Sequence, residues 1–193
     1  MTRIAIIVGS TRPGRNGTAV AEWVHQHAKS RPGVEDELVD IADLHLPVLD
    51  EPVPASMGMY SKDHTKAWAA TIASFDGFVF VTPEYNHSPS GALKNAIDYI
   101  YAEWNNKAAG FVGYGSVGGV RAVEQLRLIA AELQVATVRA QVALNLATDF
   151  ENYSVFTPAA SHQANLELLF DQLVAWTQAL EGVRADAQEA VAA

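Results

Sequence analysis

Short hydrophobic runs recur along the chain, and each is followed by a segment whose hydrophobic residues have helical spacing. The run at 4–8 has β-branched residues at four of its five positions, which is typical of a strand buried on both faces. Further strands are predicted by the runs at 34–41, 76–82, 108–114 and 135–144. The segments between and after them predict helices at 17–30, 61–73, 91–102, 120–133 and 158–180.

Strands that alternate with helices predict a parallel sheet with helices on both faces, because crossover connections are right-handed. No internal repeat or linker interrupts the pattern, so we expect one domain over 1–182, and the alanine-rich segment 183–193 is expected to fray. Residues 45–60 contain three prolines and no sustained period, which predicts a long surface loop. Ser61 is expected to cap the helix that follows it.

Three strand ends are rich in glycine and polar residues. They are the segments 9–17, 83–90 and 113–119. Ligands of parallel α/β sheets bind outside the carboxyl ends of the strands, so these segments are expected to meet at one edge and form a site.

The segment 9–17 has the composition of a phosphate-binding loop. Ser10, Thr11 and Asn16 offer neutral hydrogen-bond donors, and Arg12 and Arg15 offer charged ones. The loop leads into a predicted helix, whose first N–H groups attract anions. A loop of this kind can also serve only to turn the chain, and that alternative stays open.

Several catalytic motifs are matched only in part. The spacing Gly9-x-x-x-x-Gly14 is that of a P-loop, but Arg15-Asn16 stands where Lys-Ser/Thr is needed, which argues against nucleoside-triphosphate hydrolysis. Residues 113–118 match Gly-x-Gly-x-x-Gly, yet they follow the fourth strand and not the first, and no acidic residue ends a later strand, so a dinucleotide site is kept only as an alternative. A hydrolase elbow at Ser116 fails because Tyr114 occupies the first glycine position.

Composition and charge exclude other classes. Hydrophobic residues make up 49% of the 193 residues and charged residues 18%, which is typical of a folded domain. With 13 basic and 22 acidic residues the net charge is −9, and no basic stripe indicates nucleic-acid binding. Cysteine is absent, and the histidines lack metal-ligand spacing, so no metal site is expected. No segment resembles a signal peptide or approaches the ~20 apolar residues of a membrane span, so we expect a soluble cytoplasmic protein without membrane partners.

Four sequence blocks together carry a resemblance to a known family. They are Gly-Ser-Thr-Arg at 9–12, Pro-Glu-Tyr-Asn-His-Ser at 83–88, Gly-Ala-Leu-Lys-Asn-Ala-Ile-Asp-Tyr at 91–99 and Gly-Tyr-Gly-Ser-Val-Gly-Gly at 113–119. Over about residues 3–180 the chain resembles the NAD(P)H-dependent FMN reductases, flavodoxin-like proteins that include quinone, azo-dye and chromate reductases. The resemblance implies an α/β, flavodoxin-like three-layer sandwich with a five-stranded parallel sheet of order 2-1-3-4-5.

The resemblance also implies which residues bind FMN. The phosphate would be held by Ser10, Arg12, Asn16 and Gly17. The wall and edge of the isoalloxazine ring would be contacted by Pro83, Glu84, Tyr85 and Asn86. The pyrimidine side of the ring would be approached by Gly115, Ser116, Gly118 and Gly119. Without the resemblance, 83–86 could equally be a proline turn with an interfacial tyrosine, and Lys94 with Asp98 is interpreted as a structural pair.

The implied activity is that of an FMN-dependent NAD(P)H oxidoreductase. Hydride would pass from NADPH or NADH to the bound flavin, and electrons would then pass to a flavin, a quinone or a similar small acceptor in a ping-pong mechanism. No catalytic side chain is required, because the cofactor carries the chemistry. The alternatives are a flavodoxin-type electron carrier and a nucleotide-binding redox sensor.

Members of this family usually form a homodimer or homotetramer, and we expect the same here. Tyr99, Tyr101 and Trp104 concentrate aromatic area at the end of a predicted helix, so this segment is expected near the subunit contact. The alternative is that these aromatic side chains cover the domain's own core.

Overall fold

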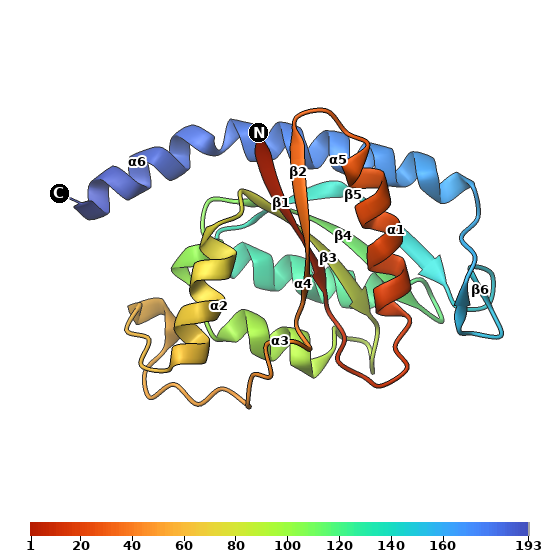
Figure 1. Cartoon of the computed structure of the whole chain (residues 1–193), viewed down its shortest axis with the longest axis horizontal. Helices are drawn as coiled ribbons and strands as arrows, with labels where there is room; N and C mark the ends of the chain where they lie inside the picture. Colours follow the sequence, from red (N-terminus) through yellow and green to blue (C-terminus); the bar gives the residue numbers. More distant parts are fainter. Residues whose placement is uncertain (193) are drawn as a thin grey trace.

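The computed structural model describes residues 1–192 and contains a sheet of five parallel strands in the order β2-β1-β3-β4-β5 (Figure 1). The strands are β1 (Thr2–Val8), β2 (Val34–Asp40), β3 (Gly77–Pro83), β4 (Ala108–Gly115) and β5 (Ala136–Asn145). Every hydrophobic run predicted as a strand is one, with its ends shifted by at most two residues. The order 2-1-3-4-5 is confirmed.

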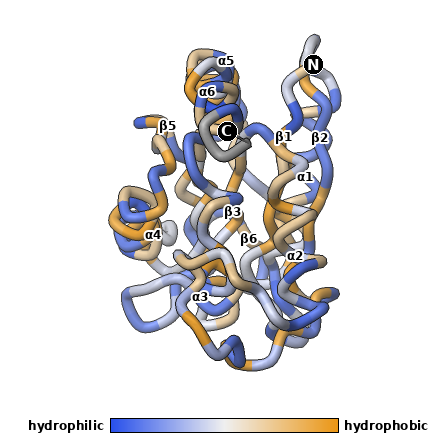
Figure 2. The backbone as a smooth tube through the Cα atoms, turned by 90° about the vertical axis from the view of Figure 1, so that its left-hand side faces the viewer, coloured by the Kyte–Doolittle hydropathy of each residue, from blue (hydrophilic) through white to orange (hydrophobic). Residues whose placement is uncertain are grey.

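Helices cover both faces of this sheet. One face carries α1 (Gly17–Lys29) and α5 (Ser161–Ala179), and the other carries α2 (Asp63–Ala73), α3 (Gly91–Asp98) and α4 (Val120–Glu132). Along helices such as α4 the colours of Figure 2 alternate between hydrophobic and hydrophilic, as in amphipathic helices with one buried side. The flavodoxin-like three-layer sandwich is therefore confirmed.

The position of a strand in the sheet explains its residue pattern. The central strands β1, β3 and β4 are buried along almost their whole length, because they have a strand on each side and helices on both faces. The outer strands β2 and β5 alternate between buried and more exposed residues. Polar residues follow the central strands directly at their carboxyl ends, which is where a site can form.

The segment 145–157, between the last predicted strand and the last predicted helix, contains a small hairpin. Its strands are β6 (Phe150–Glu151) and β7 (Val155–Phe156), which pair antiparallel. Phe150 is buried, with ring centroids 6.4 Å from Tyr114 and 5.1 Å from Phe156. Two-residue strands carry too few residues for a recognisable alternation, so the hairpin leaves no clear signal in the sequence.

The helix α2 begins at Asp63, and Ser61 is not its N-cap. Lys62 occupies that position without a capping side chain. The Ser61 hydroxyl instead donates to Glu51 Oε2 at 2.7 Å, and Glu51 also accepts from the backbone N–H of Lys62 at 2.9 Å. The Glu51 carboxylate, from the preceding loop, thus accepts the hydrogen bonds at the start of α2. Local sequence does not reveal this arrangement.

The helix α3 ends at Asp98, earlier than predicted, and a 3₁₀ turn (Ala102–Trp104) follows. Tyr99 and Trp104 are buried, and the Trp104 ring lies 4.9 Å from Phe78 between centroids. The alternative therefore holds for Tyr99 and Trp104, whose side chains fill the domain's own core, and the position of Tyr101 and the rest of this segment near a subunit contact stays a prediction.

The sequence predicts a frayed tail over 183–193. Helix α6 (Glu181–Ala192) occupies this segment as far as residue 192, and residue 193 lies outside the described residues. Alanine has the highest helix propensity, and Arg184 fixes the first turn by donating to the carbonyl oxygens of Asn106 at 3.3 Å and Thr177 at 3.2 Å. The helix continues beyond α5 and projects past the sheet (Figure 1). No helix within residues 1–192 is long and apolar enough to span a lipid bilayer. The extent of the single domain, 1–182, stays a prediction.

Candidate functional site

The three polar strand ends meet at the carboxyl edge of the sheet, as predicted. The Ser90 hydroxyl, which also caps α3, donates to the Gly9 carbonyl at 2.6 Å. Ser10 Oγ lies 3.3 Å from Tyr85 Oη, and the Glu84 N–H donates to the Tyr114 carbonyl at 3.1 Å. In Figure 1 the loop between β1 and α1 lies at the lower edge, opposite the N-terminus.

The first backbone N–H groups of α1 donate to no capping side chain among the residues that the structure describes. Asn16 is the N-cap residue, but its side-chain amide donates to the Tyr153 carbonyl of the β6–β7 hairpin at 2.9 Å. Within residues 1–192 no side chain caps this helix. The first N–H groups of an uncapped helix carry partial positive charge and suit an anion.

The two arginines of the loop have different roles. Arg15 forms an ion pair with Asp40, and it donates to the Ser10 carbonyl at 2.7 Å and to Thr18 Oγ1 at 3.1 Å. Through these contacts Arg15 stabilises the conformation of the loop. Arg12 is exposed and donates from Nε to Tyr85 Oη at 3.2 Å, and within residues 1–192 its two terminal nitrogens make no hydrogen bond. Arg12 is therefore the arginine that is available to a ligand.

The arrangement fits a phosphate group on grounds that the structure itself provides. Within residues 1–192 it combines the two terminal nitrogens of Arg12, which make no hydrogen bond, a helix N-terminus that no side chain caps, and the buried hydroxyls of Ser10 and Tyr114. The Tyr114 hydroxyl has no hydrogen-bond partner within residues 1–192. Tyr114 is not among the site residues predicted from the sequence, although a large polar residue between Gly113 and Gly115 in an apolar strand is a signal.

The segment after β3 forms a tight turn that presents Tyr85. The N–H of Tyr85 donates to the Ser88 carbonyl at 2.9 Å, and the N–H of Ser88 donates to the Tyr85 carbonyl at 3.2 Å. Asn86 and His87 between them have φ of 50° and 72°, so both are left-handed, as in a type I′ turn. Pro83 ends β3 and is buried, while Tyr85 is 38% exposed and extends toward the loop at 9–17.

Because the backbone of His87 is left-handed, a glycine at this position should change the stability of the protein. Substitution His87→Gly is expected to raise the free energy of unfolding by about 0.5–1 kcal/mol, because glycine adopts this conformation without steric cost. The matched control is Ser88→Gly, where the backbone is not left-handed and glycine should destabilise the fold. Urea unfolding of the cofactor-free variants measures both. Equal destabilisation by the two glycines would contradict the prediction.

The Glu84 side chain is used inside the protein. Its carboxylate is almost fully buried, forms an ion pair with Arg121 and accepts from the Arg121 backbone N–H at 3.0 Å, so it binds the first turn of α4. Because the Glu84 N–H is also bonded to Tyr114, only its backbone carbonyl remains for a ligand.

Close packing against β4 and β5 requires glycine at positions 118 and 119, in the loop after β4. Gly118 has φ of 75°, and its N–H donates to the Gly115 carbonyl at 3.1 Å. A Cβ on Gly118 would lie 2.9 Å from the Cβ of Ala143, and one on Gly119 would lie 2.6 Å from the Tyr114 nitrogen. Ser116 is exposed at the tip of this loop. These contacts allow the loop to lie close to β4 and β5 whether or not a ligand is bound.

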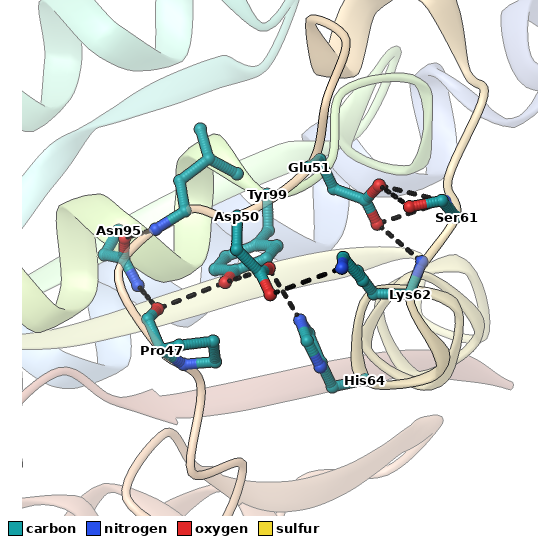
Figure 3. A network of polar contacts seen from close by, with 9 residues as sticks. Pro47, Asp50, Glu51, Ser61, Lys62, His64, Asn95 and Tyr99 are labelled. Carbon is teal, nitrogen blue, oxygen red and sulfur yellow. Dashed lines mark hydrogen bonds and ion pairs between the residues drawn. The ribbon is translucent and has the colours of Figure 1, made fainter.

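The long loop 45–60 is fixed to α2 and α3 by a polar network (Figure 3). Asn95 donates to the Pro47 carbonyl at 2.7 Å, and Tyr99 Oη donates to Asp50 Oδ1 at 3.0 Å. His64 Nε2 lies 3.0 Å from the same Asp50 oxygen. Desolvation acts to raise the pKa of Asp50, but hydrogen bonds from His64 and Tyr99 outweigh it and lower that pKa.

One cavity of about 470 Å³ lies at the opposite, amino end of the strands. It is lined by residues that include Lys107 and Arg184. Lys107 Nζ donates to the Ile72 carbonyl at 2.8 Å, so this lysine binds the end of α2. Because none of the three polar loops lines this cavity, we place the candidate site at the carboxyl edge.

Comparisons with known proteins agree with this geometry. A family model described as NADPH-dependent FMN reductase matches residues 2–149. The chain is 39% identical over 166 residues to an NAD(P)H-dependent FMN reductase of Schizosaccharomyces pombe, covering 85% of this chain and 83% of that protein. It is 48% identical over 132 residues to an NAD(P)H-dependent FMN reductase of a Nectria species, covering 65% of this chain and 66% of that protein.

A solved structure supports the fold. The flavoenzyme NAD(P)H:(acceptor) oxidoreductase FerB of Paracoccus denitrificans superposes with a TM-score of 0.71 at 22% identity, covering 92% of this chain and 98% of the other. The family model spans most of the chain, including the loops at 9–17, 83–90 and 113–119 that build the site. This chain therefore belongs to the NADPH-dependent FMN reductase family.

Proposed function

We propose that this protein is an NAD(P)H-dependent FMN reductase that transfers electrons to a small acceptor. The observation that carries the proposal is the loop at 9–17, where Arg12, two buried hydroxyls and the uncapped start of α1 converge. Membership of the family and the names of the relatives support the same conclusion.

The FMN phosphate binds in the loop at 9–17. Ser10 and Arg12 contribute side-chain donors, and Asn16 and Gly17 contribute backbone N–H groups. The Asn16 amide is bonded to the hairpin, so its side chain positions the loop rather than the phosphate. Arg15 keeps the loop in shape through Asp40.

The flavin ring lies between the segments after β3 and β4. Pro83, Glu84 and Asn86 contribute mainly backbone groups, and Tyr85 covers the phosphate end of the site. Gly115, Ser116, Gly118 and Gly119 form the opposite wall. FMN, when bound, supplies the hydride acceptor and the electron donor, so this chain orients the ring and excludes water without a side-chain acid or base.

The proposal includes the two substrates, the compartment and the oligomeric state. The hydride donor is NADPH or NADH, and the acceptor is a flavin, a quinone or a similar small molecule. We place the protein in the cytoplasm as a homodimer or homotetramer. Since Tyr99 and Trp104 are buried in the core, the subunit contact must use other residues.

Binding of FMN compared with riboflavin tests the proposal. The purified protein, or the protein with added FMN, is expected to be yellow and to bind FMN more tightly than riboflavin at equal concentration, because riboflavin lacks the phosphate. Quenching of flavin fluorescence gives both affinities. Equal affinities would contradict the phosphate assignment.

Turnover separates a reductase from an electron carrier. The FMN-loaded protein is expected to oxidise NADPH or NADH continuously when a quinone is present. A protein that binds FMN but does not oxidise either nicotinamide would instead be a flavodoxin-type carrier.

A further inference from the structure

The hydroxyl of Tyr114 is a buried polar group that the fold itself does not satisfy. Tyr114 is 5% exposed, and its Oη has no hydrogen-bond partner within residues 1–192. Burial of a hydroxyl without a partner is unfavourable, so such a group calls for an explanation. Phenylalanine would fill the same space beside Phe150 without this disadvantage.

This hydroxyl lies directly beneath the start of α1. A Cβ built on Gly17 would lie 2.7 Å from Tyr114 Oη, so the absence of a side chain at Gly17 leaves room for the hydroxyl. Gly17 is the first residue of α1, whose N-terminus no described side chain caps. The unpartnered hydroxyl and the uncapped helix therefore lie at the same point.

The groups around Tyr114 keep it a hydrogen-bond donor. Burial raises the pKa of the Tyr114 hydroxyl, and Tyr85 adds to this increase. The Ser10 side chain, which approaches the hydroxyl without the geometry of a full hydrogen bond, and the positive charges of Arg12 and Arg15 oppose this increase in part. A phenol with a raised pKa stays protonated throughout the physiological range and can donate to an anion.

We propose that Tyr114 is a binding residue of the anion site, where its hydroxyl donates a hydrogen bond to the phosphate monoester of the bound flavin nucleotide. The proposal rests on the proposed function. It explains why the strand places a tyrosine between Gly113 and Gly115, and why Gly17 is needed above it.

The variant Tyr114→Phe tests the proposal through two measurements, the affinity for FMN, which should fall, and the melting temperature, which should not fall. FMN should bind about tenfold more weakly or worse, because a hydrogen bond to a charged group is lost. The melting temperature of the cofactor-free variant should stay the same or rise by about 2–4 °C, because an unpartnered buried hydroxyl is removed. Riboflavin, which lacks the phosphate, should bind as it does to the unmodified protein.

The matched control is Tyr101→Phe. The Tyr101 hydroxyl donates to the Glu132 carbonyl at 3.1 Å, at the far end of α4 from the loop at 9–17. Its removal should leave the dissociation constants of FMN and riboflavin unchanged.

The variant Gly17→Ala tests the contact between Gly17 and Tyr114 without changing Tyr114 itself. In Gly17→Ala the new Cβ meets the Tyr114 hydroxyl, so FMN binding and the melting temperature should both fall. In the Tyr114→Phe background the same alanine meets no hydroxyl, so the fall in melting temperature should be smaller.

The outcomes separate this proposal from the function on which it rests. Unmodified protein that does not quench FMN fluorescence overturns both. Unmodified protein that binds FMN, together with Tyr114→Phe protein that binds it equally well, overturns only the role of Tyr114. Equal weakening of FMN and riboflavin in Tyr114→Phe also overturns that role, because it would show a packing defect.

Discussion

Substitution Asp149→Ala is expected to lower the free energy of unfolding by about 3 kcal/mol or more. The Asp149 carboxylate is 3% exposed and accepts from the backbone N–H groups of Asn145 at 2.8 Å and Ala159 at 3.2 Å. His162 Nε2 lies 2.9 Å from it. Alanine leaves these groups without their buried acceptor. The melting temperature should fall by roughly 6–12 °C.

The matched control is Glu151→Ala, which removes an exposed carboxylate from the neighbouring β6–β7 hairpin and should change the free energy of unfolding by less than about 0.5 kcal/mol. Urea denaturation measures both variants. If Asp149→Ala were no less stable than Glu151→Ala, the carboxylate would not organise the segment 145–159.

The Asp149 carboxylate also makes the free energy of unfolding depend on pH, in a direction that its contacts define. Burial acts to raise the pKa of Asp149, but hydrogen bonds from the N–H groups of Ala159 and Asn145, and the contact with His162, outweigh it and lower the pKa. The stability from Asp149 is therefore complete above the ordinary carboxylate pKa of about 4, and it is lost as the pH falls through the lowered value. Acid should destabilise the unmodified protein more than the Asp149→Ala variant.

Substitution Arg12→Ala is expected to weaken FMN binding about 10- to 100-fold. The loss of a charge-assisted hydrogen bond of roughly 1.5–3 kcal/mol accounts for this range. Arg15 cannot replace Arg12, because its guanidinium is held by Asp40, Ser10 and Thr18, so we expect the upper part of the range. Arg12 is exposed, so the stability of the cofactor-free protein should change by less than about 0.5 kcal/mol.

Titration with FMN and stopped-flow reduction by NADPH measure this variant. The rate of reduction at saturating FMN should stay the same, because the phosphate is distant from the reacting ring. Arg139→Ala, which removes an exposed arginine from β5, is the control and should bind FMN normally. Unchanged FMN affinity in Arg12→Ala would remove Arg12 from the phosphate site, and a large loss of reduction rate in addition would place it at the nicotinamide.

Sequence patterns predicted the strands and helices in which buried residues recur at regular spacing over many positions. A central strand such as β3 is apolar at nearly every position, and α1 carries Val20, Val24 and Ala28 at helical spacing, so both are visible without a structure. The meeting of the three polar loops also followed from sequence, because parallel strands bring their carboxyl ends to one edge.

Single side-chain contacts between distant segments could not be predicted in this way. Glu84 looks like a ligand residue in sequence, and only the fold shows that Arg121 takes its carboxylate. Asn16 has the residue type of a helix cap, yet the hairpin takes its amide. Trp104 could equally suit an interface or a core, and the choice depends on Phe78, which is far from it in the chain.

The contacts that build the candidate site join residues far apart along the chain. Ser10 meets Tyr85 across 75 residues, Ser90 meets Gly9 across 81, and Asn16 meets Tyr153 across 137. Loop closure over such separations makes folding slow relative to that of helical proteins of similar size. Because Asn16 bonds to Tyr153, a growing chain on the ribosome cannot complete the candidate site until the segment after β5 has emerged. In the proposed reductase, FMN uptake would therefore be a late step of folding, and bound flavin would mark chains that have folded completely.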